Sequence, residues 1–279
     1  MKFAKYWQKQ RVSVDRKVFG NDHIMVWGAS NESEQAAQQS AASRVSKMSA
    51  FIQGDFSKGD DYDYWIDFVK EEIVDEVKSQ AGETIAVLSR NNYGATILNT
   101  SHLVFGDIDV YPPSFTDRLM RVFGRKIKDK SYYLSLIEKY QKAHSHLAFR
   151  VYETHSGVRF ILTNKRYAPK DGAIKRLFEA LHVDPLYSRL CQQQECYRAR
   201  MTPKPWRLNM SRPTSRFPRE NESDQQAFQI WLSRYQSASA GYSVVKYMAS
   251  FGSTRVDQET QMILDLHDRN AHQKSGNLA

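Results

Sequence analysis

The sequence predicts an α/β (α+β) fold built around a βαββαβ unit of the ferredoxin-like or RRM-like type. Three observations predict it. Apolar runs alternate with helical stripes over residues 101–205, their order is strand, helix, strand, strand, helix, strand, and 41% of the 279 residues are hydrophobic, enough for a sizeable core. An α/β module is expected before this unit, over residues 1–100. A basic linker with a small C-terminal helical extension is expected after it, over residues 206–279.

The N-terminal module begins with a predicted hairpin. Residues 11–15 and 23–27 are short runs of strand-like residues, separated by a polar, glycine-containing turn. A helix capped by Ser30 or Ser33 follows and ends before Gly54, because small apolar residues recur there at steps of three and four. These alanines indicate close packing of the helix.

The rest of the module is predicted as one helix and two strands. An apolar stripe that includes Phe68, Ile73 and Val77 predicts a helix over residues 65–79. Strand-like runs follow at 84–89 and 95–99.

The βαββαβ unit and the C-terminal part follow from the same periodicities. Polymerase palms and RNA-binding RRM sheets are both built on this plan, so the fold alone does not choose between them. In the C-terminal part, His267, His272 and residues 276–279 are expected at the surface. The predicted elements are a strand over 103–110, a helix over 115–142 broken near Gly124 or Asp129, strands over 147–154 and 158–163, a helix over 172–181, a strand over 195–201, a helix over 224–236, a strand over 242–248 and a helix over 258–268.

The strand over 103–110 carries two carboxylates near its end. Side chains in a strand alternate between faces, so Asp107 and Asp109 point the same way while Ile108 points the other way. Two carboxylates roughly 6 to 7 Å apart repel one another unless a cation lies between them, and oxygen ligands on a rigid strand suit Mg²⁺ or Mn²⁺. The alternative is a strand that runs into the polar loop at Tyr111-Pro112-Pro113.

The alternation of side chains along the strands predicts that basic residues share a sheet face with these carboxylates. In the usual strand order of this fold, 4-1-3-2, the acidic strand is central, and Asp109 approaches Arg159 and residues 195–198. Arg159, Arg198 and Arg200 then face the same way as the carboxylates, on a sheet face left open by the helices. Salt bridges that only hold the fold produce the same composition, and this alternative stays open.

The charge balance favours phosphate-bearing partners. Forty Lys and Arg against 31 Asp and Glu give a net charge of +9 and a pI near 9.4. No acid occurs between Glu195 and Glu220, and the basic residues there are interleaved with Trp206 and Phe217. Such a stretch is typical of a clamp for phosphates or single strands, although a solvated basic loop is the alternative. The candidate phosphate or nucleotide contacts are Arg159, Arg198, Arg200, Lys204 and Arg207.

At Phe105-Gly106-Asp107-Ile108-Asp109, with Ser156-Gly157-Val158-Arg159 opening the third strand, the chain resembles the archaeo-eukaryotic primase superfamily. The resemblance implies that Asp107 and Asp109 are a catalytic Asp-x-Asp for two divalent metal ions, Mg²⁺ or Mn²⁺. The implied reaction is template-directed nucleotidyl transfer in DNA replication. The family has a nucleotide-binding His where this chain has Arg159, and a further metal-binding acid for which Glu195 is the candidate. A relative that binds nucleic acid or nucleotides without catalysis is the alternative function.

A second resemblance competes on the same fold. His144-Ser145-His146 looks like the His-hydrophobic-His metal motif of rolling-circle (HUH-type) replication endonucleases, with Tyr132, Tyr133 or Tyr140 as candidate nucleophiles. The middle residue is Ser, however, and the tyrosines come first in the chain. Two histidines that simply end a helix explain the same residues.

The expected partners are DNA or RNA and a nucleoside triphosphate. No membrane is expected, because no run of about 18 apolar residues occurs and the N-terminus lacks an apolar signal core. Cys191 and Cys196 are too few for a disulfide scaffold or a zinc site of four cysteines, and they fit a reducing cytoplasm. The sequence does not determine the oligomeric state.

Overall fold

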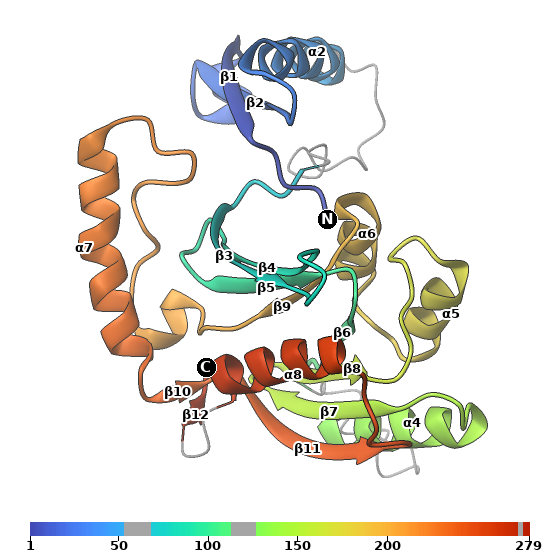
Figure 1. The fold of residues 1–279 in the computed structure, drawn as a ribbon. Coiled ribbons are helices and arrows are strands. Elements are labelled where there is room, and N and C mark those ends of the chain that lie inside the picture. Colours follow the sequence, from blue (N-terminus) through green and yellow to red (C-terminus); the bar gives the residue numbers. More distant parts are fainter. Residues whose placement is uncertain (53–67, 113–126, 273–275) are drawn as a thin grey trace. The chain divides into compact units, whose positions relative to one another are not determined.

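The structure, a computed structural model, describes residues 1–52, 68–112, 127–272 and 276–279. The chain forms two compact units, Lys2–Lys70, and Glu71–Ala279 together with Met1 (Figure 1). Its fold is mixed α/β with antiparallel sheets, as the sequence predicts at this level. Within the described residues, no helix has the length and apolar character needed to cross a membrane.

The N-terminal unit is a hairpin covered by one long helix. Its elements are β1 (Tyr6–Ser13), α1 (Arg16–Phe19), β2 (His23–Ser30) and α2 (Glu34–Ile52). β1 pairs antiparallel with β2, and the Ser33 hydroxyl accepts the Ala36 amide at the start of α2. A Cβ on Gly28 would lie 2.1 Å from the Ala37 carbonyl oxygen, so the missing side chain lets α2 lie directly on β2. The predicted hairpin and capped helix are confirmed.

The first sheet of the larger unit is formed by β3 (Glu72–Lys78), β4 (Thr84–Arg90), β5 (Thr96–Thr100) and β9 (Tyr197–Arg200), in that order. All neighbours are antiparallel. Because β5 pairs with β9, the chain on both sides of residue 100 shares one sheet. The larger unit therefore begins at Glu71 and not near the predicted division at residue 101.

The predicted helix over 65–79 is wrong, since residues 72–78 form the edge strand β3; residues 65–67 lie outside the described part of the chain. The pairing of β3 with β4 shifts register between Ile73 and Asp75 and again between Val77 and Lys78. These irregularities break the alternation expected of a strand, so the apolar residues fall at helical spacing. Ile73 and Val74 are both 46% exposed at this edge.

The second sheet contains the acidic strand. Its strands, in order, are β11 (Val245–Phe251), β7 (Phe149–Thr154), β8 (Gly157–Leu162) and β6 (Val104–Asp109). The helices α4 (Lys130–Ala143) and α5 (Gly172–Ala180) pack on one face of it, where Phe149 contacts Tyr140 and Phe160 contacts Phe178. Both helices cover the same face, as predicted. Residues 113–126 of the predicted helix over 115–142 lie outside the described residues.

The predicted strand order 4-1-3-2 is wrong for its fourth strand. β6, β8 and β7 are neighbours as expected, but β11 extends this sheet and β9 belongs to the other sheet. β9 lies beside β6 in Figure 1. The hydroxyl of Tyr187, from the unpredicted helix α6 (Pro185–Gln194), lies 2.9 Å from the Phe105 carbonyl oxygen and accepts the Arg198 amide at 3.2 Å. This hydroxyl therefore links the backbones of β6 and β9.

The sheet face expected to be open is covered by α8 (Gln258–Ala271). The His267 ring is fully buried, 5.5 Å from the ring of Phe105 and 5.0 Å from that of Tyr152. The Tyr152 hydroxyl donates to Asp268 at 2.6 Å. The expectations of an open face and of a surface His267 are therefore wrong, because long-range packing of α8 buries both. Asp109, at the end of β6, remains exposed.

Four further elements belong to the C-terminal part of the larger unit. They are the short 3-10 helix η2 (Pro205–Leu208), α7 (Glu222–Ser239), β10 (Tyr242–Ser243) and β12 (Asn277–Leu278). β12 pairs parallel with β10, and Ala279 is buried, so residues 276–279 are not a surface tail.

Replacing Gly157 with Ala is expected to lower the free energy of unfolding by about 1–3 kcal/mol. An added Cβ would lie 1.9 Å from the Ile108 carbonyl oxygen, a backbone atom of the acidic strand that cannot rotate away. Urea unfolding measures the change. Gly241→Ala is the matched control, since a Cβ there meets nothing within 4 Å. Equal effects of the two substitutions would contradict the close approach of β6 and β8.

Candidate functional site

The β6–β8 register places Asp107 directly opposite Arg159. Arg159 donates from Nε to Asp107 Oδ1 at 2.7 Å and from Nη2 to Oδ2 at 3.0 Å, a bidentate ion pair. The Arg159 side chain is 2% exposed, whereas that of Asp107 is 34% exposed. Burial alone would lower the pKa of Arg159, but the charge and hydrogen bonds of Asp107 raise it above its usual value. The predicted parity of these two residues is confirmed.

Arg159 also links the acidic strand to its surroundings. Its Nη1 donates to the Arg200 carbonyl oxygen of β9 at 3.0 Å and lies 3.4 Å from His267 Nε2 of α8. Burial, followed by the charge of Arg159, lowers the pKa of His267, while Asp268 opposes this. A neutral His267 that donates to Asp268 can accept from Arg159, so Asp107 stands at the end of a continuous polar network.

Asp109 lies at the exposed end of β6, where it pairs with Gly157. Partial burial raises its pKa above the ordinary value of 3.8, and the negative charges of Asp184 and Asp107 raise it further. Lys204 and Arg207 oppose this shift without cancelling it, so burial and the neighbouring carboxylates together disfavour the ionised form of Asp109.

Asp184 is a site residue that sequence reasoning missed. It is the N-cap of α6, and its amide donates to the Asp107 carbonyl oxygen at 3.2 Å. The pair Asp184-Pro185 is a helix-start signal, which could have located the cap. Its position beside the two strand carboxylates depends on the path of the chain, which no local pattern encodes.

Three predicted cations lie beside these carboxylates. Burial lowers the pKa of Arg200 to about 10, with the charges of Arg159 and Arg207 adding to the effect. Burial, Arg200 and Arg207 likewise lower the pKa of Lys204. Burial lowers that of Arg207, and Asp109 opposes it. The charge of Arg207 contributes to the lowering at both Arg200 and Lys204, so these side chains lie close enough to interact electrostatically.

The hydrogen bonds of Arg200 and Arg207 leave binding capacity unused. Arg200 donates to the carbonyl oxygens of Thr202 at 3.1 Å and Ala279 at 3.5 Å. Arg207 Nη2 donates to the Ser156 hydroxyl at 2.7 Å, but its Nη1 is buried and has no hydrogen-bond partner among the described residues. A buried guanidinium nitrogen without a hydrogen-bond acceptor lowers the stability of the fold unless a ligand or a water molecule accepts its hydrogen bond.

Arg198 and Glu195, two other predicted site residues, lie elsewhere. Arg198 forms an ion pair with Glu71 and donates to Gln194 at 2.8 Å, so its charge is already balanced. Glu195 has a positive φ of 53° at the C-cap of α6 and pairs with Lys170 at 2.6 Å. Glu195 ends α6 and lies before the first residue of β9, so strand parity does not predict the direction of its side chain.

An aromatic and cationic cluster adjoins the three cations. Trp206 of η2 is 42% exposed, and its ring lies 5.2 Å from that of Tyr93 in an edge-on arrangement. Arg212 lies over both rings, 4.9 Å from Trp206 and 4.5 Å from Tyr93, and Lys204 Nζ lies 5.4 Å from Trp206. We call Tyr93, Lys204, Trp206 and Arg212 the aromatic platform. Arg219, by contrast, lies over Phe228 and pairs with Glu72, which is a structural role.

The residues of the rival endonuclease motif form a helix end. His144 is the C-cap of α4, and its ring stacks on that of Tyr140 at 4.1 Å. His146 follows in the turn before β7, with its ring 6.3 Å from that of His144. This arrangement matches the helix-end explanation.

Cys191 and Cys196 are buried free thiols. Burial raises their pKa values to about 12 and 11, so both stay protonated at neutral pH. Among the residues that the structure describes, no group of three or more His, Cys, Asp or Glu is arranged to hold a metal ion.

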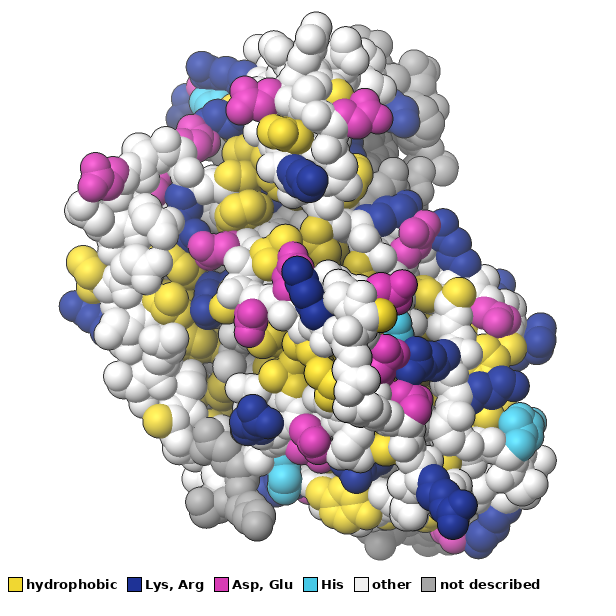
Figure 2. All heavy atoms as spheres, viewed as in Figure 1, with side chains coloured by type: hydrophobic (Ala, Val, Ile, Leu, Met, Phe, Trp, Pro, Cys, Tyr) yellow, Lys and Arg dark blue, Asp and Glu magenta, His cyan; other side chains and the backbone are white. Residues whose placement is uncertain are grey.

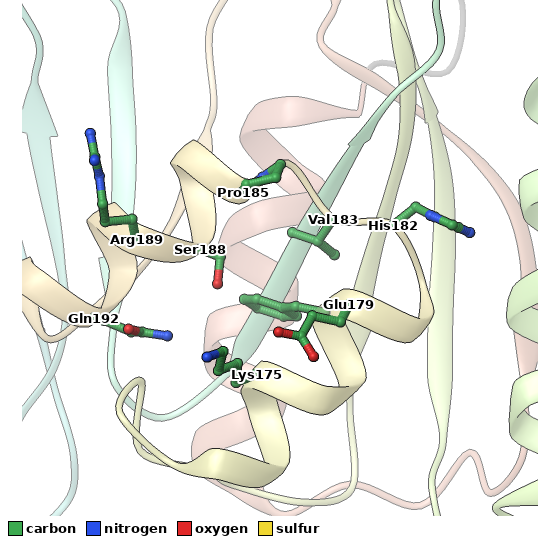
Figure 3. Close-up of a pocket in the computed structure, with 9 residues that line it drawn as sticks. Lys175, Glu179, His182, Val183, Pro185, Ser188, Arg189 and Gln192 are labelled. Atoms are coloured by element: carbon green, nitrogen blue, oxygen red, sulfur yellow. The ribbon is translucent and has the colours of Figure 1, made fainter. Parts of the chain in front are cut away.

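Two surface features lie apart from these contacts. On the face drawn in Figure 2, acidic side chains are interspersed among basic ones, so the net charge does not form one continuous patch there. A pocket of about 490 Å³ lies between α5 and α6, where Lys175 and Glu179 face Ser188 and Gln192 (Figure 3). The carboxylates and crowded cations do not line it, so it is a separate cavity.

Comparisons of the chain with protein-family profiles, with curated proteins and with solved structures gave no match.

Proposed function

We propose that this protein binds a phosphate-bearing ligand, nucleic acid or a nucleotide, at the site formed by Arg200, Lys204 and Arg207 beside Asp109. One observation carries the proposal: Arg207 Nη1 is buried and has no hydrogen-bond partner among the described residues, and it lies beside Arg200 and Lys204, whose pKa values are lowered by burial and by neighbouring positive charges. A phosphate group would supply oxygen acceptors to that nitrogen and relieve the repulsion between the cations.

The carboxylates support a further proposal, that the ligand is bound with Mg²⁺ or Mn²⁺. Asp107 and Asp109 offer oxygen donors only, which hard divalent cations prefer, and Asp184 adds negative charge beside them. Burial and the negative charges of Asp184 and Asp107 raise the pKa of Asp109, and a bound cation would stabilise its ionised form. Asp107, one third exposed, keeps lone pairs beyond those used by Arg159. Such ions are commonly held by one or two carboxylates together with phosphate oxygens and water.

Together these features fit a nucleotidyltransferase of the archaeo-eukaryotic primase kind, with β6 as the acidic strand of a palm-like unit. A bound divalent cation would supply Lewis-acid stabilisation of charge on the phosphate. Arg200, Lys204 and Arg207 would hold phosphate oxygens, and Arg159 would orient Asp107. The alternative is a protein that binds nucleic acid or nucleotides without catalysis. The observation that favours this alternative is the bidentate pair of Asp107 with the buried Arg159, which already occupies both carboxylate oxygens.

Fluorescence anisotropy with labelled single-stranded DNA and RNA at several salt concentrations tests phosphate binding. For Arg207→Gln, we expect affinity to fall about tenfold near 0.1 M salt. We also expect the slope of log K against log salt to become shallower by about 0.7–0.9, because one phosphate contact is lost.

The matched control is Arg234→Gln, which removes the same charge from an exposed position on α7. We expect this variant to bind like the wild type, and its thermal melt shows whether loss of one charge affects the fold. Equal weakening by both substitutions would indicate a response to net charge and not to the site. Absence of wild-type binding at low salt would overturn the proposed function.

A further inference from the structure

We propose that the aromatic platform stacks an unpaired base, and that the ligand of the adjoining phosphate site is therefore a single strand of nucleic acid. This inference rests on the proposed function, because Lys204 belongs to both the platform and the phosphate site. It adds the class of ligand, which the charges alone do not distinguish.

The Trp206 indole is available for stacking. It keeps 42% of its surface exposed despite its contacts with Tyr93, Arg212 and Lys204. Tyr93 meets it edge-on, at an interplanar angle of 82°, which holds the indole in place without stacking against it. The cations around it are the tips of long side chains, and Arg212 is exposed, so they can move aside or contact the phosphates of a bound strand.

The backbone of η2 connects the platform to the phosphate site. Trp206 and Arg207 are consecutive in η2, which begins with Pro205 and is followed by Asn209 with a positive φ of 54°. Arg207 reaches Ser156 across the site while Trp206 stays exposed to solvent. A phosphate on Arg207 would therefore place the base of the same or the next nucleotide within reach of the indole.

The charge around the platform favours nucleic acid as the occupant. No Asp or Glu occurs from residue 196 to residue 219, so this stretch offers only positive charge beside an exposed aromatic ring. Cations that hold a backbone and aromatic rings that stack bases are the two features shared by proteins that bind single strands. In a duplex the faces of the bases are stacked inside the helix, so the platform would discriminate against it.

The test compares three ligands of about 12 nucleotides: a single strand, the same strand with an abasic sugar at every position, and the corresponding duplex. DNA and RNA versions are both measured by anisotropy. The wild type is expected to bind the normal single strand about tenfold more tightly than the abasic strand or the duplex, because stacking of one base supplies this difference. Trp206→Leu is expected to bind the normal and abasic strands equally.

Two further variants separate stacking from folding. Trp206→Phe keeps a ring and is expected to retain most of the preference for the normal strand. Tyr247→Leu removes another large exposed ring, 51% exposed on β11, and is expected to leave all affinities unchanged. If Trp206→Leu fails to fold, the proposal is still tested by the wild-type affinities for normal and abasic strands and by the affinities of Trp206→Phe.

Equal wild-type affinity for normal and abasic strands would overturn the proposal that the aromatic platform stacks a base. It would not contradict the proposed phosphate site. Retention of the preference by Trp206→Leu would also overturn the stacking proposal, since the base would then be bound elsewhere. If neither single strand binds at low salt, the proposed function fails, and this inference fails with it.

Discussion

Replacing Asp107 with Asn is expected to lower the free energy of unfolding by about 3 kcal/mol. Asp107 is the acid that balances the Arg159 guanidinium, which is 2% exposed and has no other ion-pair partner among the described residues. An Asn side chain accepts one hydrogen bond but carries no charge, so it leaves a buried cation uncompensated. We place the effect at the lower end of the range for buried pairs because the Asp107 side chain is one third exposed. Urea unfolding at neutral pH measures it.

Asp109→Asn is the matched control, and its expected effect has the opposite sign. The pKa of Asp109 is raised in the folded protein, so its ionised form is less stable there than in the unfolded chain. The fold is therefore favoured while Asp109 is protonated, and this contribution is lost as pH rises through the folded pKa. Asn is expected to leave stability unchanged or raise it by less than about 1 kcal/mol at neutral pH.

The pH dependence separates these two aspartates further. Below the ordinary Asp value of 3.8, the wild-type Asp109 carboxyl is protonated in both states, so the difference from Asp109→Asn should disappear. Destabilisation of similar size by both substitutions would contradict the separate roles of the two residues. If Asp107→Asn left the free energy of unfolding unchanged, burial of the Arg159 charge would not depend on its ion pair with Asp107.

The second large effect is expected on metal response and catalysis. Millimolar Mn²⁺ or Mg²⁺ should raise the melting temperature of the wild type, because a ligand that binds only the folded state stabilises it. Asp184→Asn and Asp109→Asn should abolish this rise. Any metal-dependent addition of nucleotides to a primed or unprimed template should fall by about 100-fold or more, since charge stabilisation by a catalytic metal contributes several kcal/mol. Asn remains a good N-cap, so Asp184→Asn should keep α6 intact.

Glu195→Gln is the control that distinguishes the two candidates for a third acid. Glu195 pairs with Lys170, so its substitution should leave the metal-dependent rise in melting temperature unchanged. Loss of the response in Glu195→Gln but not in Asp184→Asn would reverse the assignment made from the structure. Absence of both a metal response and nucleotide addition in the wild type would favour the non-catalytic alternative.

Local patterns in the sequence were sufficient for much of the secondary structure around the site. Alternation located the acidic strand, and parity placed Arg159 on the same face as Asp107, because side chains in a strand change faces at every residue. The N-terminal hairpin and its helix followed from equally local signals. Where pairing was irregular, as at the bulges of β3, the same reasoning produced a helix that does not exist.

Interactions between residues far apart in the chain decided the rest. β9 pairs with β5 in the first sheet, while the Tyr187 hydroxyl contacts the backbones of both β9 and β6. The helix α8 covers a face that strand parity left open. Asp184 lies in the candidate site because the chain passes beside β6 just before α6 begins. Glu195 lies outside the site because it is the C-cap of α6. The sequence by itself determined which charges the acidic strand carries and which way they face. Only the tertiary structure decided which charges meet, because packing of side chains from distant segments, and not local periodicity, sets that geometry.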